Sequence, residues 1–217
     1  MPASTCGETS KTTAAFTLNA LSQIRFVWKP LVFIACLIPA ILVLTDALEI
    51  TGRLGANPIE EIQDRFGNWG LRFILAALTV TPLRQLSGWN WLTRFRRMLG
   101  LFAFFYVCTH FLVWLLLDQR LLMSAILEDI VERPFITIGF TALLLLLSMA
   151  GTSTLAMRRR LGRRWQQLHN SIYIVGMLGV WHYWWQVKLD VREPLIYASV
   201  LAALLGYRLW RRFRKSR

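Results

Sequence analysis

Three histidines, His110, His169 and His182, are the residues of this chain whose type and placement best suit redox or metal chemistry. All three lie in long apolar stretches, where an ionisable side chain is costly and by default marks a functional site. Because imidazole is an axial ligand of haem iron, one histidine from each of two facing helices could hold a haem. A hydrogen bond between helices is the alternative for any single histidine. A zinc site is disfavoured, since tetrahedral zinc needs three or four ligands close together and the three histidines lie at different depths in the membrane.

The distance along the helix from the basic residues ahead of each histidine predicts which two can meet. At the helical rise per residue, His110 lies about 20 Å beyond Arg97, and His182 lies about 27 Å beyond Arg164. His169 lies only about 7.5 Å beyond Arg164. We therefore expect His110 to pair with His182, which would place a haem in the outer half of the membrane.

His169 and His182 do not share one face of an ideal helix, because they differ by roughly 220° around its axis. Gly176 and Gly179 lie between them and permit a bend. Two interpretations stay open. Either the helix is distorted so that both histidines face the interior, or only one of the two is a ligand.

The composition predicts a membrane protein. Of the 217 residues, 55% are hydrophobic and 17% are charged, against about 45–50% and about 25% in soluble domains. The net charge of +13 falls in blocks between apolar stretches rather than along a soluble face, which argues against a nucleic-acid partner. Cys6, Cys36 and Cys108 are too scattered to predict a disulfide framework.

Six stretches approach the roughly 20 apolar residues that a membrane-spanning helix needs. They are 31–48, 69–86, 99–117, 134–157, 165–187 and 194–210. No internal repeat is evident. The expected fold is an all-α membrane protein, a bundle of six transmembrane helices with the lipid bilayer around it.

The basic residues set the predicted orientation. With the amino terminus in the cytoplasm, 18 of the 25 Lys and Arg, but only one of the 12 Asp and Glu, face inside. Because Lys and Arg in short loops follow the cytoplasmic side, both termini are predicted to be cytoplasmic. The expected organisation is a polar cytoplasmic segment (1–28), a transmembrane haem-binding domain (29–210) and a basic tail (211–217).

The predicted outer side carries three local features. Residues 49–68 are rich in glycine and proline and favour a structured loop. Residues 118–133 have an amphipathic pattern, typical either of a connecting helix or of a segment on the membrane surface or against a partner. Four aromatic residues crowd the end of the fifth stretch, either as an interfacial belt or as a wall around a haem or partner contact: Trp181, Tyr183, Trp184 and Trp185.

Several short motifs occur in order along the apolar stretches. They are Thr81-Pro82-Leu83-Arg84, Arg96-Arg97-Met98-Leu99-Gly100-Leu101 with Tyr106 and His110, Arg133-Pro134-Phe135-Ile136-Thr137-Ile138-Gly139, Thr152-Ser153, Arg160-Leu161-Gly162, Trp165, Leu168-His169, Tyr173 and His182. Their order and spacing over residues 28–210 resemble the MsrQ (YedZ) family, part of the wider ferric-reductase-like transmembrane group.

The resemblance implies a haem-binding subunit of the MsrPQ methionine sulfoxide reductase system in the bacterial inner membrane. It implies haem b with His110 and His182 as its ligands, His169 as a third family histidine, and FMN as a further cofactor. Electrons would come from the quinone pool and pass to MsrP, a periplasmic molybdopterin enzyme that reduces methionine sulfoxide in oxidised proteins. The chain would transfer electrons without a substrate-reducing site of its own.

Arg96 departs from the wider group, whose members bind two stacked haems through two histidines on each of two helices. It stands where the second histidine of the third stretch would be expected, and arginine is a poor metal donor. Its guanidinium could pair a haem propionate or a flavin phosphate, or be one more cytoplasmic anchor. Arg72 in the second stretch could likewise pair a propionate or extend to the membrane interface.

The sequence argues against one source of electrons, a nicotinamide bound by the chain itself. No GxGxxG-type fingerprint occurs, so we do not expect the chain to take hydride from a nicotinamide by itself. Electrons would arrive from quinol or from a separate flavoreductase. A transporter or proton relay that uses the intramembrane histidines is the competing interpretation, and a scaffold subunit without a cofactor is the third.

Overall fold

The computed structural model describes residues 22–187 and 190–215, and the regular structure in these ranges is helical, as predicted. The chain divides into two compact units, residues 1–38 and 39–217. Helix α2 (Lys29–Ala47) follows a π-helical turn, η1 (Ile24–Trp28), so the end of the predicted polar segment is helical. The rest of that segment, residues 1–21, lies outside the described residues.

The second unit holds the remaining helices. Their bounds are α3 (Pro58–Ser87), η2 (Asn90–Arg94), α4 (Arg96–Val113), η3 (Trp114–Asp118), α5 (Met123–Glu132), α6 (Pro134–Gly151), α7 (Leu155–Leu161), α8 (Arg163–His169), α9 (Ile172–Gln186) and α10 (Arg192–Lys215).

Local sequence explains where several helices begin and end. Pro58 and Pro134 occupy the first turns of α3 and α6, where a missing amide hydrogen is tolerated. Gly88 ends α3 in the left-handed conformation, with φ 75°. Gly162, with φ 51°, separates α7 from α8.

The structure changes the predicted boundaries in three places. The loop expected over 49–68 ends at Asn57, because α3 begins with a proline and two acidic residues that suit a helix N-terminus. The stretch 134–157 stops at Gly151, and the stretch 165–187 is broken between α8 and α9. The segment 118–133 forms the amphipathic helix α5.

Three helical segments in the described part of the chain are long and apolar enough to cross a membrane: Ile24–Ala47, Arg96–Asp118 and Pro134–Gly151. Helices α3, α9 and α10 cover the other predicted stretches, but they do not meet the same criteria of length and hydropathy. The number of six spans therefore stays a prediction.

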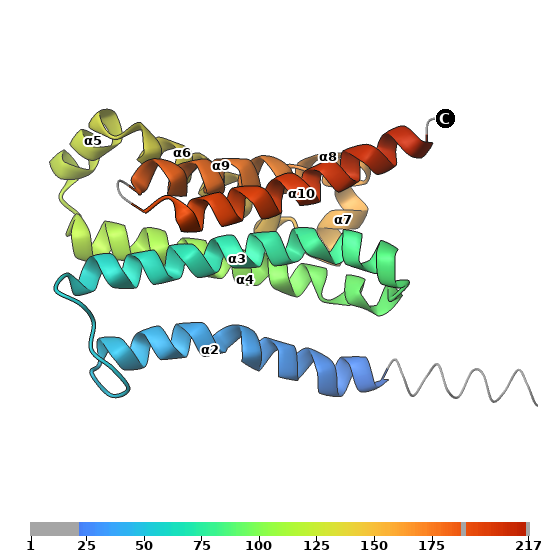
Figure 1. Ribbon diagram of the computed structural model, residues 1–217, viewed down its shortest axis with the longest axis horizontal. Coiled ribbons are helices and arrows are strands. Elements are labelled where there is room, and N and C mark those ends of the chain that lie inside the picture. The colour runs from blue at the N-terminus through green and yellow to red at the C-terminus, as the bar shows by residue number, and fades with distance from the viewer. Residues whose placement is uncertain (1–21, 188–189, 216–217) are drawn as a thin grey trace, which may run out of the picture. The chain divides into compact units, whose positions relative to one another are not determined.

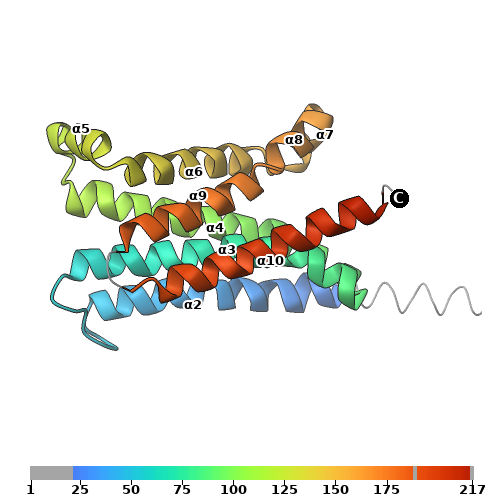
Figure 2. The ribbon, with the colours of Figure 1, turned by 45° about the horizontal axis from the view of Figure 1, so that its top comes forward.

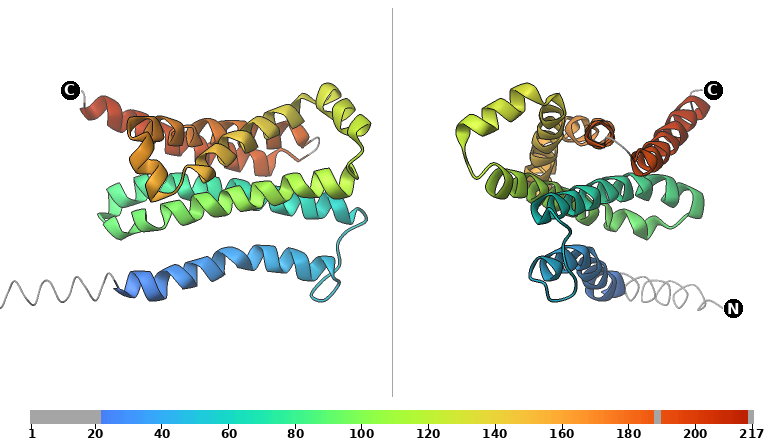
Figure 3. Two further views of the ribbon diagram at one scale, coloured as in Figure 1. Left: turned by 180° about the vertical axis from the view of Figure 1, so that it is seen from behind. Right: turned by 60° about the vertical axis from the view of Figure 1, so that its left-hand side comes forward.

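Two helix pairs form the body of the second unit, α3 with α4 and α6 with α9 (Figure 1). Helix α3 also contacts α9, and α4 contacts α6, so the two pairs enclose a common interior (Figure 2). Helix α10 packs against α9 and α3, and Figure 3 shows α9 between α6 and α10. Gly70 lets α3 and α4 approach closely, because a Cβ there would lie 2.7 Å from Val107 Cγ2.

Tyr106 of α4 connects the core to the second half of α2. Its side chain is fully buried and stacks on Phe73, with ring centroids 5.0 Å apart. Pro39 interrupts the hydrogen bonding of α2, and the Ala40 amide donates to the Tyr106 hydroxyl at 3.0 Å. The hydroxyl thereby satisfies a backbone donor next to the proline.

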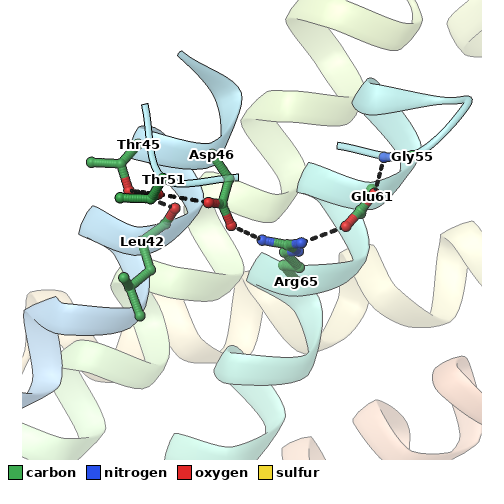
Figure 4. Close-up of polar contacts among 7 residues, drawn as sticks. All are labelled: Leu42, Thr45, Asp46, Thr51, Gly55, Glu61 and Arg65. Carbon is green, nitrogen blue, oxygen red and sulfur yellow. Dashed lines mark hydrogen bonds and ion pairs between the residues drawn. The ribbon is translucent and has the colours of Figure 1, made fainter. Parts of the chain in front are cut away.

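A polar network closes the loop between α2 and α3 (Figure 4). Arg65 Nη1 pairs with Asp46 Oδ2 at 2.6 Å, and Arg65 Nη2 pairs with Glu61. Glu61 also accepts a hydrogen bond from the Gly55 amide, and Thr51 donates to Asp46 Oδ1 at 2.7 Å. The Gly55 amide and the Arg65 guanidinium together lower the pKa of the Glu61 carboxyl.

This network predicts a pH-dependent loss of stability. Glu61→Gln should lower the thermal midpoint at pH 7 by no more than about 4 °C, as expected for an exposed ion pair. Because the folded-state pKa of Glu61 is depressed, its contribution is present above the ordinary carboxyl range and is lost as pH falls through the folded pKa. Thermal unfolding in detergent from pH 7 to pH 3 should therefore show the difference between the two proteins shrinking with acid.

Glu128→Gln is the matched control, since Glu128 is an exposed carboxylate on α5. It should leave the midpoint unchanged at every pH. A Glu61→Gln difference that stays constant down to pH 3 would contradict the proposed linkage.

Candidate functional site

A cavity of about 340 Å³ lies in the interior that α3, α4, α6 and α9 enclose. His110 of α4 and His182 of α9 both line it. Its deeper wall is apolar and includes Leu71, Leu146 and Val175. Cavities of this size, mostly apolar with a few converging polar groups, are typical of small-molecule and cofactor sites.

The two histidine rings face each other across this cavity. Their centroids are 6.1 Å apart and their planes are nearly perpendicular, at 86°. Imidazole nitrogens bind metals at about 2.0–2.1 Å, so two rings on opposite sides of one metal ion have centroids about 6 Å apart. The observed spacing therefore fits one iron between the rings.

Backbone carbonyls fix the orientation of both rings. His110 Nδ1 lies 2.7 Å from the Gln63 carbonyl oxygen, and His182 Nδ1 lies 2.7 Å from the Phe135 carbonyl oxygen. Because a carbonyl oxygen only accepts, each Nδ1–H is the donor, which leaves each Nε2 unprotonated. A ligating histidine normally has this hydrogen bond on its other ring nitrogen, where it increases the basicity of the ligand.

A glycine lies against each histidine ring. A Cβ on Gly67 would lie 2.9 Å from His110 Nδ1, and a Cβ on Gly139 would lie 2.9 Å from His182 Nδ1. Real Cβ atoms essentially never come this close to another heavy atom. Glycine at these two positions therefore makes room for the rings beside α3 and α6.

The two halves of the site repeat one another. In each half the carbonyl acceptor precedes the histidine by 47 residues, and the glycine follows that acceptor by about one helical turn. The α3–α4 pair and the α6–α9 pair thus supply equivalent ligand, acceptor and glycine. This equivalence concerns a few site positions, namely two backbone acceptors, two glycines and two histidines.

Comparison with known proteins gives the family. A family model described as a ferric reductase like transmembrane component matches residues 66–180. The relative named protein-methionine-sulfoxide reductase heme-binding subunit MsrQ from Xanthomonas campestris pv. campestris (strain 8004) is 55% identical over 159 residues, 73% of each chain. The chain belongs to the MsrQ family.

Two further relatives with the same name agree with this assignment. The protein from Ralstonia nicotianae is 53% identical over 166 residues, which are 75% of this chain and 76% of the relative. The protein from Xanthomonas euvesicatoria pv. vesicatoria (strain 85-10) is 54% identical over 159 residues, 73% of each chain. No solved structure matches the chain.

Charged groups also line the cavity in this MsrQ-family chain. Glu60, Asp64 and Asp118 line it, and Arg133 supplies the one guanidinium among its described lining residues. Burial, and then the charge of Glu60, raise the pKa of the Asp64 carboxyl. Arg133 also contacts Asp129 at 3.3 Å, and its position makes it the best placed cation for an acidic group of a bound cofactor.

His169 is not brought to the other two histidines. It ends α8 and stacks on Trp165 with ring centroids 4.0 Å apart, and its Nε2 lies 3.2 Å from Thr152 Oγ1. Arg96 is close enough to interact electrostatically with His169, and neither residue lines the cavity. The predicted site residues thus separate into the His110–His182 pair and a second group that contains His169 and Arg96.

Arg72 lies outside the cavity. Its side chain is exposed, its Nε donates to the Tyr197 hydroxyl at 2.8 Å, and its guanidinium lies 4.8 Å from the Trp69 ring. Arg72 is not among the residues that line the cavity. These contacts favour a role in attaching α3 to α10 over a role beside the histidine pair.

Sequence reasoning missed the groups that orient the histidines. The carbonyls of Gln63 and Phe135 are backbone atoms, so no side-chain pattern indicates them. Gly139 and Arg133 belong to a motif that carries the family resemblance, but their roles depend on contacts with residues far along the chain. An equal spacing between glycine and histidine in the two halves is the one signal that sequence inspection could have used.

The two glycines generate a stability prediction. Gly67→Ala and Gly139→Ala should each lower the thermal midpoint, because the added methyl displaces an imidazole and breaks its hydrogen bond, at a cost of about 1–3 kcal/mol. Gly100→Ala is the matched control, since its Cβ would meet no atom within 4 Å. That change should leave the midpoint unchanged or raise it, because alanine favours a helix. Thermal unfolding in detergent measures all three, and an unaffected Gly67→Ala protein would argue against the tight contact.

Proposed function

We propose that this chain binds haem b between His110 and His182 and transfers electrons to an MsrP-type methionine sulfoxide reductase in the periplasm. The observation that carries the proposal is the facing pair of imidazoles, 6.1 Å apart, each with its Nδ1 hydrogen bonded to a backbone carbonyl. The relatives' names, which describe a heme-binding subunit of a protein-methionine-sulfoxide reductase, support it.

The residues of the chain suit a haem that only transfers electrons. When bound, the haem supplies one-electron redox chemistry. His110 and His182 would hold the haem iron through neutral imidazole nitrogens, an arrangement that suits electron transfer rather than binding of a substrate or oxygen. The apolar wall would restrict solvent and tune the potential, and Arg133 would pair with a propionate.

The proposed path across the membrane depends on the predicted orientation. With six spans and both termini in the cytoplasm, the charged end of the cavity would lie on the periplasmic side of the bacterial inner membrane, beside the proposed partner. Quinol from the membrane is the proposed donor, because the sequence has no nicotinamide-binding motif. The FMN that the resemblance implies stays a prediction, without an assigned residue.

A proton relay receives less support from the same contacts. Each imidazole donates its Nδ1 proton to a peptide carbonyl, which does not pass a proton onward. The contacts of His110 and His182 therefore orient Nε2 and do not form a chain of exchangeable donors and acceptors.

Histidine substitutions test the haem proposal. His110→Ala and His182→Ala should each lower the haem content of the purified protein more than about tenfold, because each removes an axial ligand, and even an outer-shell change costs 10–100-fold in affinity. The readout is the Soret band per mole of folded protein, with gel filtration to establish folding.

His169→Ala is the matched control, because His169 lies outside the cavity. It should retain the Soret band of the His110–His182 haem. A colourless but folded parent protein, or a site that is emptied by His169→Ala alone, would overturn the assignment.

A further inference from the structure

Arg208 is the first cation of the basic last part of α10, and it extends toward α3. Its Nη2 donates to the Leu78 carbonyl at 2.7 Å, and its guanidinium carbon lies 4.7 Å from the centre of the Tyr173 ring on α9. The remaining two nitrogens, Nε and Nη1, are buried and make no hydrogen bond of normal distance and angle, and the Tyr173 side chain lies near enough to interact with the guanidinium. None of the ion pairs among the described residues includes Arg208. Buried donors without an acceptor are costly, so these two N–H groups indicate a missing oxygen.

The charge around Arg208 favours an electron-rich ligand. Arg96 is close enough to interact electrostatically with it, and Tyr173 provides a hydroxyl and an aromatic face beside it. A guanidinium offers five donors and no acceptor. The group that fits is therefore a ring or anion that carries acceptor oxygens and can lie against an aromatic side chain.

An apolar groove lies on the surface of α9 and α10, and its described lining residues end one turn short of Tyr173 and Arg208. It has a volume of about 370 Å³ and runs between α9 and α10, lined mainly by Met177, Trp181 and Trp184 of α9 and by Ala198, Ala202 and Leu205 of α10. Trp181 is 57% exposed and Trp184 is 42% exposed, whereas the small alanines keep the α10 side open.

The register of the two helices places the groove and Arg208 in one line. Tyr173 lies one turn before Met177 on α9, and Arg208 lies one turn after Leu205 on α10. Residues separated by three or four positions share a helix face. The polar pair therefore continues the groove at the end where α9 begins and α10 ends.

We propose that α9 and α10 bind an isoprenoid quinol, with its head group at Arg208 and Tyr173 and its apolar tail in the groove. This inference rests on the proposed quinol donor. The ring oxygens would accept from Nε and Nη1, and the positive charge would stabilise the anionic forms through which a quinol is oxidised. A phospholipid is the rival occupant, but its phosphate belongs in the head-group layer, and Arg208 lies one turn deeper than Arg211 and Arg212.

The site lies at a suitable distance from the histidine pair. Tyr173 and His182 are on the same helix, about 14 Å apart along its axis at the helical rise. Oxidation of the quinol to the quinone breaks two O–H bonds and releases two protons to solvent and two electrons. Each ferric haem iron would accept one electron, so one quinol would reduce the irons of two chains, or one iron that passes its first electron to the proposed reductase before it accepts the second.

Reduction kinetics test the site in the haem-loaded full chain. The probe is decylubiquinol, and the readout is the rate of Soret change at a series of quinol concentrations. Arg208→Gln should raise the half-saturating concentration about tenfold or more, as expected for loss of a charged hydrogen bond. Its spectrum and its reduction by dithionite should be unchanged. Ala202→Phe, which fills the groove without touching Arg208, should raise the same concentration.

Arg212→Gln is the matched control, since Arg212 is an exposed cation of the same helix. It should reduce at the parental rate. Equal half-saturating concentrations for Arg208→Gln, Ala202→Phe and the parent would overturn the inference.

Binding without electron transfer separates this inference from the proposed function. Decylubiquinone should raise the thermal midpoint of the His110→Ala protein, which lacks a haem ligand, and should not raise that of His110→Ala/Arg208→Gln. This result would support the quinol site even if no haem copurified with the parent. A parent that holds haem but neither binds decylubiquinone nor is reduced by decylubiquinol would overturn the quinol site and leave the haem proposal standing. A shift produced by phosphatidylglycerol, and not by decylubiquinone, would assign the groove to lipid and also overturn it.

Discussion

Two hydrogen bonds between imidazole and backbone carbonyl determine the arrangement on which the site depends. A histidine in an apolar helix has several rotamers and two tautomers, and a metal accepts only an unprotonated nitrogen that points at it. The carbonyls of Gln63 and Phe135 select one tautomer and one ring direction for His110 and His182. The rest of the helix packing places these carbonyls within reach.

The hydrogen bonds to these carbonyls require close contact between each histidine ring and the neighbouring helix. A ring that donates to a carbonyl on the next helix must lie against that helix, and a side chain one turn further along would occupy the same space. Gly67 and Gly139 leave this space free for the rings. Close packing of α3 with α4, helped by Gly70 against Val107, keeps the donor and acceptor helices at the required separation. The orientation of the two histidine rings therefore depends on the close packing of these helices.

The sequence predicts the chemistry of this chain better than it predicts the geometry of the site. The apolar stretches and three histidines predict a helical haem protein, and depth alone favours the two histidines that the structure brings together. The break between His169 and Ile172 was not predicted, because the stretch 165–187 is apolar enough to suggest one helix. The extension of α3 to Pro58 was missed for the opposite reason, since its first turns are charged and resemble a loop. Backbone acceptors and long-range glycine contacts leave no local pattern in a sequence.

The equivalence of the two helix pairs has a consequence for the proposed haem complex. His110 and His182 would each have the same kind of outer partner at the same distance, a backbone carbonyl 2.7 Å from Nδ1. Neither histidine would then be held less firmly than the other, so both would stay in place to hold the iron when its oxidation state changes.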